Sequence, residues 1–162
     1  MVLGLAEVRA AAQTAGTVAA YVSHGSEPST LALLDHLSAR GVRVLLPVVR
    51  PDRDLDWALD DGTRRPGVVR GVLEPGGPRL GVEAISAADV VLVPALAVDA
   101  GGRRLGQGGG SYDRALARTR AGAAVVALLH PGELLESVPV AGHDRRVDVA
   151  VTSERVVRFG AQ

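Results

Sequence analysis

The chain of 162 residues has no formal net charge, because 18 basic side chains, all of them arginine, balance 18 acidic ones. This balance gives no overall field toward nucleic acid or an anionic membrane, so we expect neither as a partner. Neither cysteine nor lysine occurs, which excludes thiol nucleophiles, cysteine-bound zinc, Walker A lysines and Schiff-base chemistry.

Helix and strand patterns alternate along the first part of the chain. The alanine-rich residues 5–16 predict a short helix, and residues 18–22 predict a short buried strand. Residues 30–40 have leucines at helical spacing with a serine or threonine at the N-cap, which predicts an amphipathic helix. Residues 42–49 follow as a nearly continuous apolar strand.

The rest of the chain keeps this rhythm after an irregular stretch. Residues 50–82 are rich in Pro, Gly, Asp and Arg, and they predict a long functional loop region with one short edge strand at most. A helix is predicted to start near Tyr112, and apolar strands are predicted at 89–96, 123–129, 147–152 and 155–159. Together these patterns predict a single α/β domain over 1–162, with three αβα layers around a mostly parallel, Rossmann-like sheet.

One segment, RLGQGGGSYDRAL at 104–116, places four glycines directly before a predicted helix. A helix start presents unpaired N–H groups and partial positive charge, and glycines let an anion approach without a Cβ in the way. Arg104 adds a guanidinium, Ser111 a hydroxyl that caps the helix or binds the anion, and Asp113 a carboxylate for Mg²⁺ or for the helix dipole. The dinucleotide fingerprint is incomplete, so the residues alone favour a phosphate or nucleotide site, with a plain turn as the alternative.

The wider segment PALAVDAGGRRLGQGGGSYDRAL, residues 94–116, resembles the signature of the 5-formyltetrahydrofolate cyclo-ligases, also called 5,10-methenyltetrahydrofolate synthetases. The family pattern is a proline-containing strand end, an Asp, a Gly, then Arg-Leu-Gly-x-Gly-x-Gly, one or two tyrosines and an Asp. Other stretches occur in the family's order: AAYVSHGSEPST, VRVLLPVV, GVLEP at 71–75 and GHD at 142–144. The resemblance therefore extends over nearly the whole chain.

The resemblance implies 5-formyltetrahydrofolate and ATP as substrates and Mg²⁺ as cofactor. ATP would phosphorylate the formyl oxygen, and N10 of the folate would close on the activated carbon as phosphate leaves, giving 5,10-methenyltetrahydrofolate, ADP and phosphate. Such a site mainly positions two substrates and neutralises phosphoryl charge. With no apolar run of ~20 residues and no signal sequence, we expect a cytoplasmic monomer that binds only these small molecules.

Residue by residue, the resemblance implies Arg104, Tyr112 and Asp113 as the catalytic group. Asp113 would hold the magnesium, and Tyr112 would lie near the reacting formyl group. The residues that would bind ATP are Arg104, Gly106, Gly108, Gly109, Gly110, Ser111 and Tyr112.

For the folate, the resemblance implies contacts from Glu27, Trp57, Glu74 and Tyr112. Glu27 matches the family's acid that meets the pterin end. Trp57 would lie against the ring system, although a tryptophan in this stretch would equally well pack in a small hydrophobic cluster of its own. Glu74 and Pro75 are expected to shape the wall of the site.

The histidines give a weaker signal. His143 and Asp144 match the family's His-Asp pair, for which a structural and a catalytic role are both open. His24, His36 and His130 lack metal-ligand spacing, so we expect them to be ordinary loop or surface residues.

Two departures from the family pattern define an alternative function. Ser111 replaces the first tyrosine of the usual pair, which keeps a hydroxyl and loses the ring. The family's first helix normally carries lysines and arginines that reach the ATP phosphates, whereas this chain has Arg9 alone. This indicates either that translation starts upstream of Met1 or that part of the clamp is lost, as in a non-catalytic folate or nucleotide binder. Sugar-phosphate isomerases and CoA transferases share such a fold, but no matching Glu nucleophile or lysine base occurs here.

Overall fold

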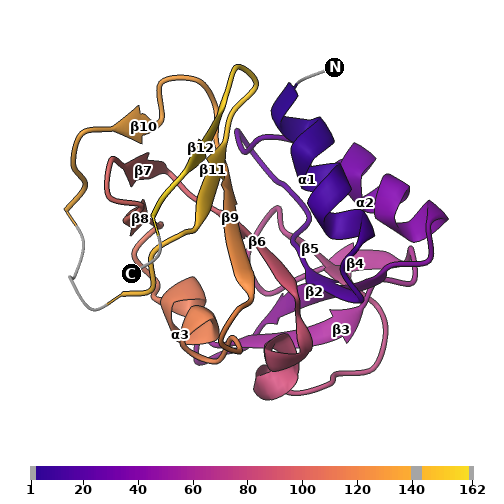
Figure 1. Cartoon of the computed structure of the whole chain (residues 1–162). Coiled ribbons are helices and arrows are strands. Elements are labelled where there is room, and N and C mark those ends of the chain that lie inside the picture. Colours follow the sequence, from indigo (N-terminus) through magenta and orange to yellow (C-terminus); the bar gives the residue numbers. More distant parts are fainter. Residues whose placement is uncertain (1–2, 140–143, 161–162) are drawn as a thin grey trace.

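A seven-stranded sheet forms the centre of the computed structural model, which describes residues 3–139 and 144–160 (Figure 1). The order across the sheet is β12-β11-β9-β6-β1-β2-β3. The strands are β1 (Thr17–Ala19), β2 (Arg43–Val49), β3 (Leu55–Leu59), β6 (Val90–Pro94), β9 (Ala124–Leu128), β11 (Val149–Val151) and β12 (Val156–Arg158). The inner strands run parallel and the two edge strands pair antiparallel, so the predicted mostly parallel sheet is confirmed.

Helices cover both faces of this sheet (Figure 1). One face carries α1 (Leu3–Gln13) and α2 (Leu31–Ala39), and the other carries the 3-10 helix η1 (Val82–Ala87) and α3 (Ser111–Ala117). The predicted three-layer αβα arrangement is therefore confirmed. No helix in the described part of the chain is long and apolar enough to span a bilayer.

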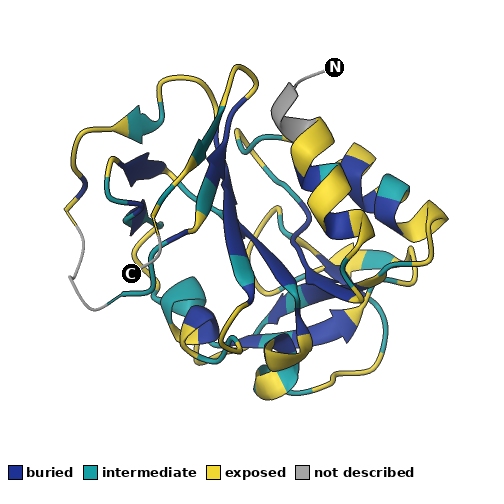
Figure 2. Cartoon of the chain, in the orientation of Figure 1, coloured by how far each residue is buried: buried dark blue, intermediate teal, exposed yellow. Residues whose placement is uncertain are grey.

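The strands β6 and β9 are apolar throughout because both of their faces are buried. Successive side chains of a strand point to opposite faces, so in β6 Val90 and Leu92 join the core under α1 and α2. Val91 and Val93 point the other way and join the core under η1 and α3. Figure 2 shows the result, a buried sheet between helices whose outer surfaces are exposed.

Thr30 occupies the predicted N-cap position of α2, but its side chain makes no capping bond. Its hydroxyl donates instead to the backbone oxygen of Tyr21 at 2.7 Å and accepts from the backbone N–H of Ser23 at 2.9 Å. The buried threonine thus ties down the segment that follows β1.

Region 50–82 contains more strand than the sequence predicted. Besides β3, it forms a hairpin of β4 (Arg64–Pro66) and β5 (Leu73–Pro75). In β3, Leu55 and Trp57 are buried on either side of half-buried Asp56, and the strand lies at the edge of the sheet, paired with β2. Because aspartates and glycines surround these short strands, composition favoured a loop.

A second sheet, in the order β10-β7-β8, leads into the glycine-rich segment. Its strands are β7 (Ala97–Asp99), β8 (Arg104–Leu105) and β10 (Leu134–Leu135). Buried Asp99 closes the β7–β8 turn by accepting from the backbone N–H groups of Gly101 and Arg103 and from Arg103 Nε. Burial alone would raise the pKa of Asp99, but these donors lower it, so the turn is held by a charged carboxylate.

The turn between β2 and β3 is attached to α3 by an ion pair. Arg118 donates from both Nη atoms to the two carboxylate oxygens of Asp54, each at 2.7 Å. The Arg118 bond lowers the pKa of Asp54 to about 2. Because both side chains are mostly shielded from water, at 22% and 14% exposed, solvent screens this pair weakly.

We expect Arg118→Ala to lower the free energy of unfolding at pH 7 by roughly 1–3 kcal/mol, because Asp54 loses charge-assisted bonds. The folded pKa lies below the ordinary value of 3.8, so the stabilisation is present above that pH and is lost as pH falls through about 2. Urea denaturation followed by Trp57 fluorescence measures the difference at pH 7 and pH 3. The exposed Arg155→Ala is the control. A destabilisation equally large at both pH values would contradict this assignment.

Candidate active site

A cavity of about 640 Å³ opens at the carboxyl ends of the parallel strands. Its wall is formed by the segments that follow β1, β2 and β6, by the β4–β5 hairpin and by residues 104–113. β1 pairs with β2 on one side and with β6 on the other, so the order of the strands reverses at β1, next to the cavity. Open α/β sheets bind their ligands at this kind of position.

Residues 106–110 form a loop that lies along the cavity. Within the described residues, the backbone N–H groups of Gly106 to Gly110 have no hydrogen-bond acceptor. Gly108 and Gly110 have φ values of 94° and 70°, which glycine adopts readily. The loop therefore leaves backbone N–H donors free beside the cavity, and a phosphate site requires such donors.

The cap of α3 differs from the predicted one. Gly110 is the N-cap residue, and Ser111 makes no capping bond. The Ser111 hydroxyl donates to the backbone oxygen of Arg53 at 2.6 Å. The Ser111 hydroxyl therefore does not cap the helix, and the binding of an anion by Ser111 stays a prediction.

The three residues predicted as the catalytic group lie together. Arg104 is buried, and it donates from Nη2 to Asp113 Oδ1 at 3.0 Å and from Nη1 to the backbone oxygen of Pro94 at 3.1 Å. Its guanidinium lies over the Tyr112 ring, 5.8 Å from the centroid. Arg104 Nε is buried and has no partner within the described residues. The arginine thus links the end of β6 to the first turn of α3.

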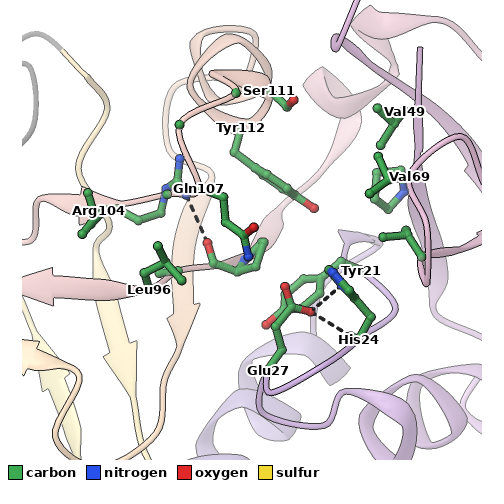
Figure 3. A pocket seen from close by; sticks show the side chains of 18 of the residues that line it. Tyr21, His24, Glu27, Val49, Val69, Leu96, Arg104, Gln107, Ser111 and Tyr112 are labelled. Carbon is green, nitrogen blue, oxygen red and sulfur yellow. Dashed lines mark hydrogen bonds and ion pairs between the residues drawn. The ribbon is translucent and has the colours of Figure 1, made fainter. Parts of the chain in front are cut away.

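Tyr112 projects from α3 toward Tyr21 and Glu27, which lie on the other side of the cavity (Figure 3). Burial raises the pKa of Tyr112, and the nearby Glu27 carboxylate raises it further, against a lowering by Arg104. Burial likewise raises the pKa of Tyr21, reinforced by Tyr112, Glu27 and Glu133. Both phenols therefore stay protonated at neutral pH and can donate hydrogen bonds.

Tyr21 was not predicted as a site residue. Its side chain is 3% exposed, and its hydroxyl is buried without a partner in the described part of the chain. A buried unpaired hydroxyl is costly unless something bonds to it. Its position at the end of an apolar strand, in a chain with only 2% aromatic residues, was the available signal.

Histidines hold the loop that carries Glu27. Glu27 Oε2 accepts from the backbone N–H of His24 at 2.9 Å and lies 3.3 Å from His24 Nδ1. His130 Nε2 donates to the backbone oxygen of Ser26 at 2.6 Å. The sequence assigned these two histidines no role, whereas here they position a cavity carboxylate. His36 lies on α2, outside the cavity, next to Gln13.

Two predicted folate contacts are not at the cavity surface. Trp57 is 1% exposed and packs in the core with Leu55 and Ile85, so the predicted contact with the folate ring is wrong and the core alternative holds. Glu74 is 4% exposed, and its Oε1 accepts from the backbone N–H of Val49 at 3.0 Å. Its carboxylate supports Val49, a wall residue, and does not line the cavity.

Asp113 is the predicted metal ligand. No group of three or more metal-binding side chains occurs within residues 3–139 and 144–160. Mg²⁺ commonly takes only one or two protein carboxylates and completes its shell with phosphates and water, so a single aspartate beside a loop of free amides fits that chemistry. Asp144 also lines the cavity, while its predicted partner His143 lies outside the described residues.

A three-layer α/β fold with a glycine-rich loop, a buried arginine and a carboxylate at its switch point is typical of enzymes that bind a nucleotide. The sequence profile of the 5-formyltetrahydrofolate cyclo-ligase family matches residues 4–153. The chain is 47% identical over 144 residues to the 5-formyltetrahydrofolate cyclo-ligase of Mycolicibacterium smegmatis, covering 86% of this chain and 74% of that protein. It is 33% identical over 146 residues to the Escherichia coli K12 enzyme of the same name, covering 88% and 80%.

Solved structures agree. The NMR structure of Aquifex aeolicus 5,10-methenyltetrahydrofolate synthetase matches with a TM-score of 0.80 at 25% identity, over 98% of this chain and 80% of that one. The Mycoplasma pneumoniae synthetase shares the fold, with a TM-score of 0.71 at 16% identity over 93% and 83%. This chain therefore belongs to the 5-formyltetrahydrofolate cyclo-ligase family, and the predicted family and enzyme class are confirmed.

We expect Gly106→Ala to weaken ATP binding roughly tenfold by displacing a charge-assisted donor. A Cβ at this position would lie 2.8 Å from Arg104 Nη1, so the guanidinium has to move. Isothermal titration with ATP measures the change. Gly77→Ala is the matched control, because its Cβ would approach no atom closer than 3.7 Å and it lies outside the cavity. Equal ATP affinity in the Gly106 variant and the wild type would refute this role of the glycine.

Proposed function

We propose that this chain uses ATP to cyclise 5-formyltetrahydrofolate to 5,10-methenyltetrahydrofolate, releasing ADP and phosphate. The observation that carries the proposal is the Arg104 cluster, in which a buried guanidinium contacts Asp113 and Tyr112 beside a loop of free amides. The cavity of about 640 Å³ is within the usual size range of small-molecule sites.

The reaction needs one bond exchange at phosphorus and then one at carbon. The formyl oxygen of the folate attacks the γ-phosphorus of ATP, and ADP leaves. N10 then attacks the formyl carbon, whose oxygen now carries the phosphoryl group, N10 loses its proton, and the carbon–oxygen bond breaks with phosphate as leaving group. Most of the catalytic work is to hold the two substrates in line and to neutralise the phosphoryl charge.

The phosphate end of the site is built from Arg104 and the loop 106–110. The loop amides would donate to phosphate oxygens, and the Arg104 guanidinium would neutralise charge on the transferred group. Asp113 would hold Mg²⁺ together with the ATP phosphates, and the bound ion would supply further neutralisation of their charge. Arg104 orients this carboxylate through their 3.0 Å bond.

The folate end is built from Glu27, Tyr112 and Tyr21. Glu27 would accept from N–H groups of the pterin, while the protonated phenols would donate to its oxygen or nitrogen acceptors. Tyr112 lies between Arg104 and this end, which suits a position near the reacting formyl group. Val69 and Leu96 add apolar surface from opposite sides of the cavity (Figure 3).

The proposal extends to the partners and the compartment expected from the sequence: a monomer that works in the cytoplasm on small molecules.

The test is the absorbance of methenyltetrahydrofolate after purified protein is mixed with 5-formyltetrahydrofolate, Mg²⁺ and ATP, compared with the same mixture without ATP. An ATP-dependent rise is expected. Binding of both ligands without that rise would replace this function by the alternative, a non-catalytic folate or nucleotide binder.

We expect Asp113→Asn to lower kcat roughly a hundredfold or more, because it removes the carboxylate that would hold Mg²⁺ on the ATP phosphates. The fold should be retained, since the Asp113 side chain is 39% exposed. The same absorbance assay, with Mg²⁺ varied, measures the loss. Asp35→Asn, an exposed change on α2, is the control. Unchanged Mg²⁺-dependent turnover in the Asp113 variant would remove the metal assignment.

A further inference from the structure

Arg53 lies in the turn between β2 and β3 and lines the cavity. Its backbone N–H donates to the oxygen of Arg50 at 2.9 Å, and the N–H of Arg50 donates to the oxygen of Asp54 at 2.9 Å. Arg53 has φ of 65°, and within the described residues it is the one non-glycine residue with positive φ. Hairpin turns usually place glycine at such a position, because a Cβ is strained there.

Side chains of α3 hold this strained turn in place. The Arg53 oxygen accepts from Ser111 Oγ at 2.6 Å and from Arg114 Nη2 at 2.9 Å. Arg118 holds the next residue, Asp54, through two bonds. The turn is therefore fixed to the helix that follows the glycine-rich loop, and strain of this kind collects at functional sites.

The Arg53 guanidinium lies beside the end of the loop. A Cβ built on Gly109 would be 3.6 Å from Arg53 Nη1, just as one on Gly106 would be 2.8 Å from Arg104 Nη1. The loop thus has an arginine against each end, with free backbone amides between them.

The described carboxylates near the Arg53 guanidinium pair with other arginines. Within the described residues the Arg53 guanidinium has no hydrogen-bond or ion-pair partner, whereas nearby Asp52 pairs with Arg50 and Asp54 with Arg118. Two guanidinium groups flanking free amides are complementary to a chain of phosphates.

We propose that Arg53 binds the polyphosphate chain of ATP from the side opposite Arg104. This inference rests on the proposed ATP-dependent function and adds a residue to it. The strained backbone is then the means by which a turn residue from the far edge of the sheet reaches the glycine-rich loop.

Arg53→Gly tests the inference without endangering the fold, because glycine suits the positive φ and the bonds to the Arg53 oxygen remain. Isothermal titration with ATP and with AMP, and thermal unfolding, are compared with the wild type. We expect ATP affinity to fall roughly tenfold, as for a lost charge-assisted bond, while AMP affinity changes less than twofold. The melting temperature should be unchanged or higher, and the KM for 5-formyltetrahydrofolate unchanged.

Arg50→Ala is the matched control. It removes an equal charge from the same turn, but its side chain pairs with Asp52 and does not line the cavity. ATP affinity within twofold of the wild type is expected for it.

The outcomes separate this inference from the proposed function. A wild type that forms methenyltetrahydrofolate beside an Arg53→Gly variant of equal ATP affinity would overturn the role of Arg53 alone. Equal losses of ATP and AMP affinity would show a general structural role and would also overturn it. A wild type that binds no ATP would overturn both proposals.

Discussion

The Arg104 guanidinium is the group on which the geometry of the cavity depends. It bonds to the end of the central strand β6 and to Asp113 on α3, so one side chain joins sheet and helix across the glycine-rich loop. It also lies over the Tyr112 ring. The phenol of Tyr112 is close enough to Glu27, on the opposite side of the cavity, for the Glu27 charge to raise its pKa. A planar group with five donors can serve all these partners at once, whereas an ammonium group cannot.

The fold was predictable where burial acts on long, continuous segments. The helices α1 and α2 and the strands β2, β6 and β9 are apolar over enough residues for their periodicity to stand out. The one short edge strand allowed in region 50–82 was not located, because β3 has only five residues and lies among aspartates, and β8 and β10 have only two residues each. Such short strands exist because of their partners, which local sequence does not reveal.

The site was predictable where its residues are neighbours in sequence. Arg104, Tyr112 and Asp113 belong to one motif, and they do meet in space. Arg53 and Tyr21 reach the same cavity from distant segments, so only tertiary structure assembles them. The error at Trp57 has a physical cause: its polar neighbours suggested a loop, whereas strand alternation turns this side chain into the core.

The apolar surface of the cavity has a consequence for folding thermodynamics. Val69 and Leu96 line the cavity and are 38% and 48% exposed. A ligand that covers these two side chains removes apolar surface from water, as packing in the core does. Because such a ligand binds the native state alone, it also stabilises that state by mass action. For a protein built this way, resistance to unfolding and proteolysis rises with the supply of its own substrate.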